Sequence, residues 1–543
     1  MIQPRLQAQY NFGKLSKILA WVLVLAYSFI LFYRPLEFED GWWHIKVGEW
    51  IHANKDVPRT EILNPINNTR PWVILQWMGS LIFYEVYRLA GIEGLKIFRA
   101  LVFFAVFIIF VFFARKKLPS SLLLACVLIL GFFLQGRCLM RPVILSIVFT
   151  EIFIILILLY LRNRNFKYLW ALLPITALWG NIHSEAFVIG SVLIAAIIIP
   201  EAVAWLNSFI SKNADVRGQS AKALCRLLIV FIGFLFMFTV SPYGPQGLDN
   251  LAGMIFDQDY KYIRTIILEH LPPKFGGVIY RIIMAALVAA SFVLIRKNTK
   301  NNFFYFLLIS MPFGLFLSAV REAPFFSVAV LFTIAEMAYG VSLASFWKTK
   351  RFCRWLANFI YCAVSVISAL SILYLCHISV YRDNLARPFL LEPYYPSGVV
   401  KAVDFLKKNK VSGTTFNSYV YGGYLLFAGF PELKPVVDGR IAYLDLLNMH
   451  ANVLEDPKKN WPGYAHDFNV KVALLESTDL QHKQIIRFLQ KDPEWQMVFV
   501  SLGTVVFVKK GIFDLSEEAL ALQGTLEQQS LSLADAEALF KLT

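Results

Sequence analysis

Long apolar runs separated by short polar segments make up roughly the first 380 residues of the chain. A helix needs about 20 apolar residues to cross a hydrocarbon core roughly 30 Å thick. Runs of that length predict about eleven membrane-spanning helices, and hence a polytopic α-helical membrane protein. The predicted spans lie near residues 15–36, 93–114, 119–135, 142–161, 168–180, 185–206, 223–241, 277–295, 303–320, 324–347 and 355–380.

The positive charge between these runs alternates in a regular way. Each basic segment lies in an even-numbered connection, on the same side as the N-terminus. Because short cytoplasmic loops are enriched in Lys and Arg, this alternation predicts a cytoplasmic N-terminus and an extracytoplasmic C-terminus. The basic segments are 115–117, 162–167, 212–222, 296–300 and 348–354.

One further apolar segment, 72–89, does not fit the alternation as a span. It carries Gln76, Glu85 and Arg88, and counting it would place every later basic loop outside. We therefore predict an amphipathic helix that lies in the outer membrane interface. The first outer loop then extends over residues 37–92, within a transmembrane domain that covers residues 1–387.

The composition agrees with a membrane protein. Hydrophobic residues make up 57% of the chain and the mean hydropathy is +0.57, far from the values of soluble globular proteins. The net charge of +15 could suggest nucleic acid as a partner. Because most of the Lys and Arg lies in short loops that orient the chain, we predict membrane lipids as partners and no nucleic acid.

The pattern changes after residue 387. Residues 388–396 form a proline-rich linker, residues 397–512 alternate strand-like and helix-like runs, and residues 513–543 form a tail with helical periodicity. The alternation predicts a small extracytoplasmic α/β domain, with strands near 413–416, 434–437, 470–475, 496–501 and 504–509 and helices near 396–410 and 480–490. This outer domain lacks cysteine, which suits the inner membrane of a bacterium and its periplasmic side.

Two features of the outer side carry candidate chemistry. The first is Asp40, which follows the first span directly and is flanked by Glu39, Trp43 and His44. Such a carboxylate could act as a general base or as a metal ligand, and it could also be an ordinary solvated loop acid. His44 shares a helical face with Asp40, and Trp43 could stack on a sugar ring or anchor the chain at the interface.

The second feature is a set of charged and polar residues in the other outer loops. Arg137, Arg141 and Arg321 could hold a phosphate, because a guanidinium binds phosphate oxygens in pairs; Arg137 and Arg141 could instead snorkel to the headgroups or pair with them. His183 and Glu185 could bind sugar hydroxyls or, with Asp40, complete a site for a divalent metal ion; His183 could also be structural. Because polar groups beside spans are costly when isolated, we predict that these residues converge on one cavity.

Several short motifs together resemble a family. They are Asp40-x-Trp-Trp-His44, Pro71-Trp72 with Gln76-Trp77, Arg141-Pro142, Trp179-x-Asn181-x-His183, Arg321-x-x-Pro324-x-Phe326, Gly-Gly-Tyr-Leu at 422–425 and Asp-Gly-Arg at 438–440. Over residues 38–508 the chain resembles bacterial members of the GT-C superfamily of glycosyltransferases, related to protein O-mannosyltransferases and aminoarabinose transferases. The resemblance implies that Asp40 is the catalytic carboxylate of the first outer loop and that the donor is a polyprenyl-phosphate-linked sugar.

The chain departs from that family at three places. Ser184-Glu185 stands where relatives often have Gly-Gly, and Glu269-His270 stands where they tend to have Glu-Trp. The second outer loop, 136–141, is purely basic, whereas some members carry a second acid there, which leaves metal dependence open. The substrate-binding candidates are Glu39, Trp43, His44, Arg137, Arg141, Asn181, His183, Glu185 and Arg321.

These features predict an inverting membrane glycosyltransferase that acts on the extracytoplasmic face, with a protein, a lipid or a glycan as acceptor. Two other classes of function stay open. A transporter of lipid-linked saccharides would place polar residues on both faces and would break helices near the midplane, and the polar asymmetry argues against it. A non-catalytic envelope assembly protein would keep the same fold without needing Asp40. The Asp438-Gly439-Arg440 turn is either ligand-facing or a structural Asp–Arg pair.

Overall fold

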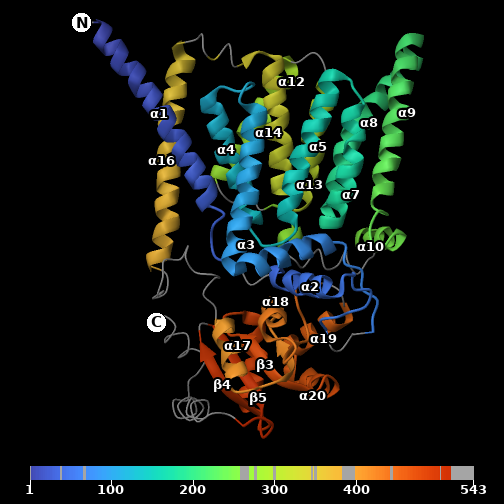
Figure 1. Ribbon diagram of the computed structural model, residues 1–543, viewed down its shortest axis with the longest axis vertical. Coiled ribbons are helices and arrows are strands. Elements are labelled where there is room, and N and C mark those ends of the chain that lie inside the picture. Colours follow the sequence, from blue (N-terminus) through green and yellow to red (C-terminus); the bar gives the residue numbers. More distant parts are fainter. Residues whose placement is uncertain are drawn as a thin grey trace.

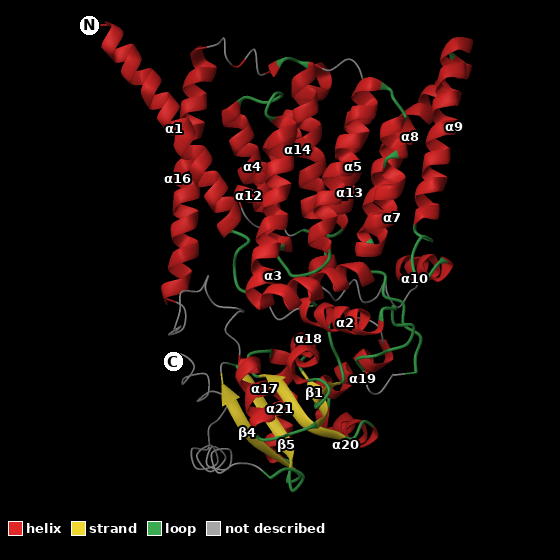
Figure 2. Ribbon diagram, in the orientation of Figure 1, coloured by secondary structure: helices red, strands yellow, loops and turns green. Residues whose placement is uncertain are grey.

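A bundle of long helices and a smaller α/β domain at one end of it make up the protein (Figure 1). The computed structural model describes residues 2–36, 40–64, 69–256, 268–273, 278–297, 301–343, 347, 351–381, 398–440, 444–501 and 503–514. Helices form the bundle, and the strands of the sheet are confined to the α/β domain (Figure 2). Glu39, the predicted linker 388–396 and nearly all of the predicted tail 513–543 lie outside the described residues.

Each of the eleven segments predicted to span the membrane contains a helix. In chain order the helices are α1 (Ile2–Ile30), α3 (Trp77–Ala114), α4 (Ser120–Leu134), α5 (Val143–Asn163), α7 (Leu172–Ile182), α8 (Glu185–Ile210), α9 (Ala214–Met237), α12 (Val278–Lys297), α13 (Asn302–Ser318), α14 (Ala323–Gly340) and α16 (Arg351–Tyr381). Within the described ranges, seven helical segments are long and apolar enough to cross a membrane. At 11 residues, α7 covers about 17 Å, roughly half of a hydrocarbon core.

Two helical segments lie between the bundle and the α/β domain (Figure 1). One is α2 (Gly41–Asn54), and the other is the part of α3 that precedes Gly91. Gly91 has a φ of 62° and a ψ of −156°, which breaks the helix and lets the chain turn into the bundle. The predicted amphipathic helix at 72–89 corresponds to the part of α3 before this break.

The α/β domain contains a five-stranded mixed sheet in the order β2-β1-β3-β5-β4. Its strands are β1 (Gly413–Asn417), β2 (Leu433–Pro435), β3 (Val470–Glu476), β4 (Trp495–Ser501) and β5 (Thr504–Lys509). Strand β1 pairs in parallel with β2 and β3, while β5 is antiparallel to β3 and β4. The helices are α17 (Gly398–Lys408), α19 (Leu444–Glu455), α20 (Pro457–Asp467) and α21 (Lys483–Lys491). All five strands lie where the sequence predicts them, but α19 and α20 were not predicted.

One apolar core joins the α/β domain to the bundle. Helix α18 (Gly422–Tyr424) and the π-helical turn η6 (Leu425–Gly429) present Tyr424 and Phe427 to α2. The ring of Trp42 lies 5.6 Å from that of Tyr424 and 4.7 Å from that of Phe427, centroid to centroid. Trp42 is only 1% exposed. The domain is therefore packed onto α2 rather than tethered beside it.

A histidine in the core of the α/β domain makes its stability dependent on pH. His450 is buried and stacks on Phe416 with a ring distance of 4.3 Å, and neither ring nitrogen has a hydrogen-bond partner among the described residues. Burial, followed by the charge of His482, lowers the pKa of His450 to about 3. Because the unfolded chain binds a proton near pH 6.5 and the folded chain does not, stability falls as the pH drops from about 6.5 toward 3.

We expect His450→Phe to remove part of this acid sensitivity. The loss attributable to His450 reaches about 1.4 kcal/mol per pH unit between those limits. Thermal unfolding of the full-length protein in detergent at pH 7.5 and pH 4.5 measures it, and the difference between the two melting temperatures should shrink in the variant. His466→Phe is the control, since His466 is exposed. An unchanged difference in His450→Phe would contradict the assignment.

Candidate active site

Asp40 lies at the N-terminal end of α2, where the first predicted span gives way to the helix that faces the α/β domain. Its carbonyl oxygen accepts the His44 N–H at 3.2 Å. An Asp at this position commonly caps the helix with its carboxylate, but Asp40 makes no such bond. Instead Oδ2 lies 3.2 Å from Nε of Arg141, and 21% of the side chain is exposed.

Close contact between α2 and the loop that follows α4 brings these two side chains together. A Cβ atom added at Gly41 would lie 2.6 Å from the carbonyl oxygen of Met140, so only glycine allows the approach. Buried Arg99 of α3 fixes the same region, because it donates to Phe32 O at 3.1 Å and to Cys138 O at 3.0 Å. Arg99 thereby ties the end of α1 to the loop that carries Arg141.

The electrostatic surroundings raise the pKa of Asp40. Removal of the carboxylate from water is the largest cause, and the negative charges of Glu269 and Asp438 act in the same direction. Arg141 and, to a smaller extent, Trp43 oppose the shift. A carboxylate with a raised pKa is a stronger base than a solvated aspartate, which is the property that a general base near neutral pH needs.

Arg137 and Arg141 share one carboxylate. Nη1 of Arg137 donates to Oε2 of Glu269 at 3.1 Å, and Nη1 of Arg141 donates to both oxygens of Glu269 at 3.2 Å. Arg137 follows α4 in the short helix η1 (Gln135–Arg137), while Glu269 lies in η2 (Leu268–His270). Two guanidinium groups from one loop are thus gathered beside Asp40.

Arg321 continues this network. It lies in η3 (Val320–Glu322) and pairs with Glu185 at 3.0 Å through Nη2 and with Glu322 at 3.0 Å through Nε. Its Nη1 donates to Nε2 of His270 at 3.0 Å, and its carbonyl oxygen accepts from Nε of Arg137 at 3.2 Å. Residues from four other segments of the sequence are therefore joined to Asp40 through a continuous chain of polar contacts.

The two histidines of the site are both neutral, with opposite tautomers. Burial is the main cause that lowers the pKa of His44 well below 6.5 and that of His183 to about 4. The Ser80 hydroxyl donates its proton to Gln76 O at 3.2 Å, so it accepts from Nδ1–H of His44 at 2.7 Å. In His183, Nδ1 accepts the Glu185 N–H at 3.2 Å, which leaves Nε2–H as a donor.

The structure places Trp42 and Trp43 inside the protein. Trp43 is 8% exposed, and its ring stacks on His44 with a centroid distance of 3.6 Å. These contacts make the two tryptophans walls of the site rather than anchors at a lipid surface. The proposed stacking of Trp43 on a sugar would require an exposed face of the indole, which these contacts do not provide.

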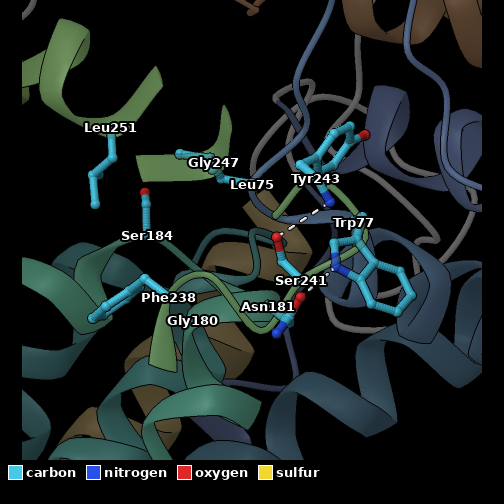
Figure 3. Close-up of a pocket in the computed structure, with 10 residues that line it drawn as sticks. All are labelled: Leu75, Trp77, Gly180, Asn181, Ser184, Phe238, Ser241, Tyr243, Gly247 and Leu251. Carbon is cyan, nitrogen blue, oxygen red and sulfur yellow. Dashed lines mark hydrogen bonds between the residues drawn. The ribbon is translucent and has the colours of Figure 1, made fainter. Parts of the chain in front are cut away.

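Asn181 has a different setting from the charged residues. Its Oδ1 accepts from Nε1 of Trp77 at 2.7 Å, and its Nδ2 donates to Ala177 O and Val240 O, both at 2.7 Å. The amide ties α3, α7 and the segment after α9 together. Asn181 also lines a small, partly open pocket (Figure 3), with Leu75, Trp77, Gly180, Ser184, Phe238, Ser241, Tyr243, Gly247 and Leu251.

Each carboxylate around Asp40 already has a cationic partner. Glu269 is held by two arginines and Glu185 by Arg321. In the part of the chain that the structure describes, no group of three or more His, Cys, Asp and Glu side chains is arranged to hold a metal ion. The pairing of Asp40 and Glu185 in a metal site therefore stays a prediction that no observation supports, and the donor set present favours guanidinium groups as the phosphate ligands.

Sequence reasoning did not predict which residues of the α/β domain lie next to Asp40. Burial is the largest cause that raises the pKa of Tyr419, and the charges of Asp40 and Asp438 act in the same direction; the charge of Asp438 also adds to the rise in the pKa of Asp40 that burial causes. Glu61 pairs with Arg440 at 2.9 Å. Local signals for these residues are weak, since only the Asp-Gly-Arg motif marks the region, and nothing in the sequence places that motif opposite the first outer loop.

The fold is shared with two solved membrane transferases. The first is the archaeal oligosaccharyltransferase AglB from Archaeoglobus fulgidus, solved with an inhibitory peptide and a dolichol-phosphate. It aligns over 93% of this chain and 77% of its own, with a TM-score of 0.53 and 10% identity. The second is ArnT from Cupriavidus metallidurans, solved with undecaprenyl phosphate. It aligns over 92% of this chain and 98% of its own, with a TM-score of 0.50 and 11% identity.

The chain therefore shares its fold with both of these membrane proteins, in agreement with the resemblance that the motifs predicted. No protein-family model matches the sequence, and no curated protein resembles it at a significant level. At such low identity the likeness shows the fold, and the reaction has to be argued from the residues of the site.

Proposed function

We propose that this protein is an inverting membrane glycosyltransferase. It moves a sugar from a polyprenyl-phosphate-linked donor to an acceptor hydroxyl or amine on the extracytoplasmic face of a bacterial inner membrane. One observation supports this most directly: a carboxylate with a raised pKa lies 3.2 Å from an arginine that belongs to a cluster of three guanidinium groups. Transfer from a phosphate-linked donor needs both a base and cationic groups for the departing phosphate.

The residues divide the reaction between them. Asp40 takes the proton of the acceptor O–H or N–H as the acceptor atom bonds to the anomeric carbon of the sugar. The bond from that carbon to the phosphate oxygen breaks, and polyprenyl phosphate leaves with the electron pair. A single displacement of this kind inverts the anomeric carbon. Arg137, Arg141 and Arg321 stabilise the negative charge that grows on the phosphate oxygen.

The neutral histidines suit recognition of the sugar. Nε2–H of His183 is a donor to sugar oxygens without the charge that would repel the arginines. Since its pKa is about 4, His183 stays neutral near pH 7, where Asp40 has to be ionised to act as the base. Glu185 holds Arg321 at 3.0 Å, so we assign it the placement of that guanidinium rather than a direct contact with the acceptor.

Purified protein in lipid nanodiscs, offered labelled polyprenyl-phosphate sugars, tests this proposal. The expected result is transfer of the label to an added acceptor or to water, with one polyprenyl phosphate released per sugar. Movement of intact labelled lipid across a liposome membrane without release of polyprenyl phosphate would favour the transporter. Neither transfer nor movement, over a panel of donors, would favour the assembly protein.

We expect Glu269→Gln to move the acid limb of the pH–rate profile to lower pH. The charge of Glu269 raises the pKa of Asp40, and its removal also frees Arg137 and Arg141 from a shared partner. Asp40 then stays ionised to a lower pH, so the fraction of active enzyme at pH 5 rises. The kcat/KM for transfer measured between pH 4.5 and pH 8 checks this. A limb that moves to higher pH would show that Glu269 is not the charge acting on the base.

A further inference from the structure

A turn of the α/β domain lies directly against Asp40. A Cβ atom added at Gly439 would lie 1.9 Å from Oδ1 of Asp40, 3.1 Å from its Cγ and 3.8 Å from Nε1 of Trp43. No side chain larger than a hydrogen atom fits at position 439 unless the carboxylate moves. Oδ2 of the same carboxylate faces Arg141, so Asp40 is held between an arginine of the bundle and a glycine of the α/β domain.

Buried ion pairs hold this turn on both sides. Arg440 donates to Asp438 from Nε at 2.8 Å and from Nη2 at 2.6 Å, and its Nη1 donates to both oxygens of Glu61 at 2.9 Å and 3.2 Å. The side chains of Glu61, Arg440 and Asp438 are at most 5% exposed. Burial alone would lower the pKa of Arg440, but the two carboxylates outweigh it and the net shift is upward.

The partner of Arg440 in the first outer loop is itself fixed. Oε1 of Glu61 accepts the backbone N–H groups of Leu63 at 2.7 Å and Asn64 at 3.1 Å. The Asn64 amide then donates to Val436 O at 3.1 Å, just before the turn. Because every member of a buried charged network must stay paired, the turn cannot shift away from the loop without leaving an uncompensated charge.

We propose that Gly439 is a positioning residue for Asp40, and that the Glu61–Arg440–Asp438 triad is the device that sets it in place. The α/β domain thereby determines where the carboxylate points. This inference rests on the proposed function, since it takes Asp40 as the base of the transfer reaction. A base misplaced by about 1 Å can cost on the order of 100-fold in rate, so a single methyl group at position 439 is expected to act on chemistry rather than on binding.

Gly439→Ala, compared with Gly463→Ala, tests the proposal. An added Cβ at Gly463 of α20 meets nothing within 4 Å, so this variant makes the same change in the same domain without touching the site. We expect Gly439→Ala to lower kcat by about 10- to 100-fold with little change in the donor KM, and to move the acid limb of the pH–rate profile. Gly463→Ala should have the same kcat, the same donor KM and the same acid limb as the wild-type protein.

A double substitution separates positioning from general damage. In Gly439→Ala combined with Asp40→Asn, the rate should equal that of Asp40→Asn alone, because the methyl group acts only through the carboxylate. Glu61→Gln, which keeps the shape of the buried partner, should lower kcat several-fold. Asp445→Asn should leave kcat unchanged. The Arg70–Asp445 pair at 2.7 Å also joins the loop to the domain, but it is exposed and exposed ion pairs contribute little.

The outcomes are distinguishable from failure of the proposed function. If wild-type transfer depends on Asp40 but Gly439→Ala keeps the wild-type kcat and pH profile, the positioning role is wrong and the proposed function stands. An additional loss in the double variant would also overturn it. If Asp40→Asn transfers sugar at the wild-type rate, the proposed function fails first.

Discussion

Asp40→Asn will lower kcat/KM for sugar transfer by about 10³-fold, the scale on which a general base acts. Asparagine keeps the size of the side chain but cannot take the proton of the acceptor. Since the proposed mechanism assigns the donor phosphate to the arginines and not to Asp40, the donor KM should change little. Initial rates of polyprenyl phosphate release, measured with the full-length protein in nanodiscs, provide the test.

Asp56→Asn is the matched control for that substitution. Asp56 is an exposed acid of the same loop, and its carboxylate accepts the Val57 N–H at 2.7 Å rather than making any contact with the network around Asp40. Its loss should leave transfer unchanged. Equal turnover in Asp40→Asn and in the wild-type protein would remove Asp40 from the mechanism.

Arg141→Ala will lower kcat/KM by about 10²- to 10³-fold, as expected for loss of a charged group that stabilises a departing phosphate. It will also move the acid limb of the profile upward, because Arg141 opposes the rise in the pKa of Asp40. Asp40 must be ionised to act, so the variant loses more activity at pH 5.5 than at pH 8. A pH series of kcat/KM measures both effects in one experiment.

Two further variants serve as controls for Arg141→Ala: Arg141→Lys keeps the charge, and Arg88→Ala removes an arginine outside the site. Lysine keeps the charge near Asp40 without the paired donors of a guanidinium, so the limb should stay close to its wild-type position while the rate falls. Arg88 is an exposed member of a pair with Glu85 at 2.8 Å, and its removal should have no effect on transfer. A limb that does not move in Arg141→Ala would contradict the assigned influence on the base.

Hydrophobic periodicity was enough to locate all five strands and most of the helices. Each predicted span contains a helix, and each predicted strand of the α/β domain is present within a few residues, because apolar runs and alternating runs report directly on burial. Helix α20 was missed for a local reason. It has Pro457 in its first turn and Pro462 inside, and prolines at such spacing usually indicate a loop.

The sequence did not predict which residues pair with the charged residues of the site. It singled out Arg137, Arg141 and Arg321 as phosphate ligands, but it gave no sign that Glu269 bridges two of them. A buried guanidinium needs a counter-charge, and the residue that supplies it can come from any loop on the same side. The contact of Asp40 with Gly439 is more distant still, since about 400 residues separate the two positions and no local pattern marks such a meeting.

The packing of Trp42 against Tyr424 and Phe427 has a consequence for how the protein matures. Until the ribosome has synthesised the region that carries these rings and the turn after them, Asp40 lacks one of its walls. On the proposed function, we expect sugar transfer to begin only once the turn that carries Gly439 has been synthesised and has packed against Asp40.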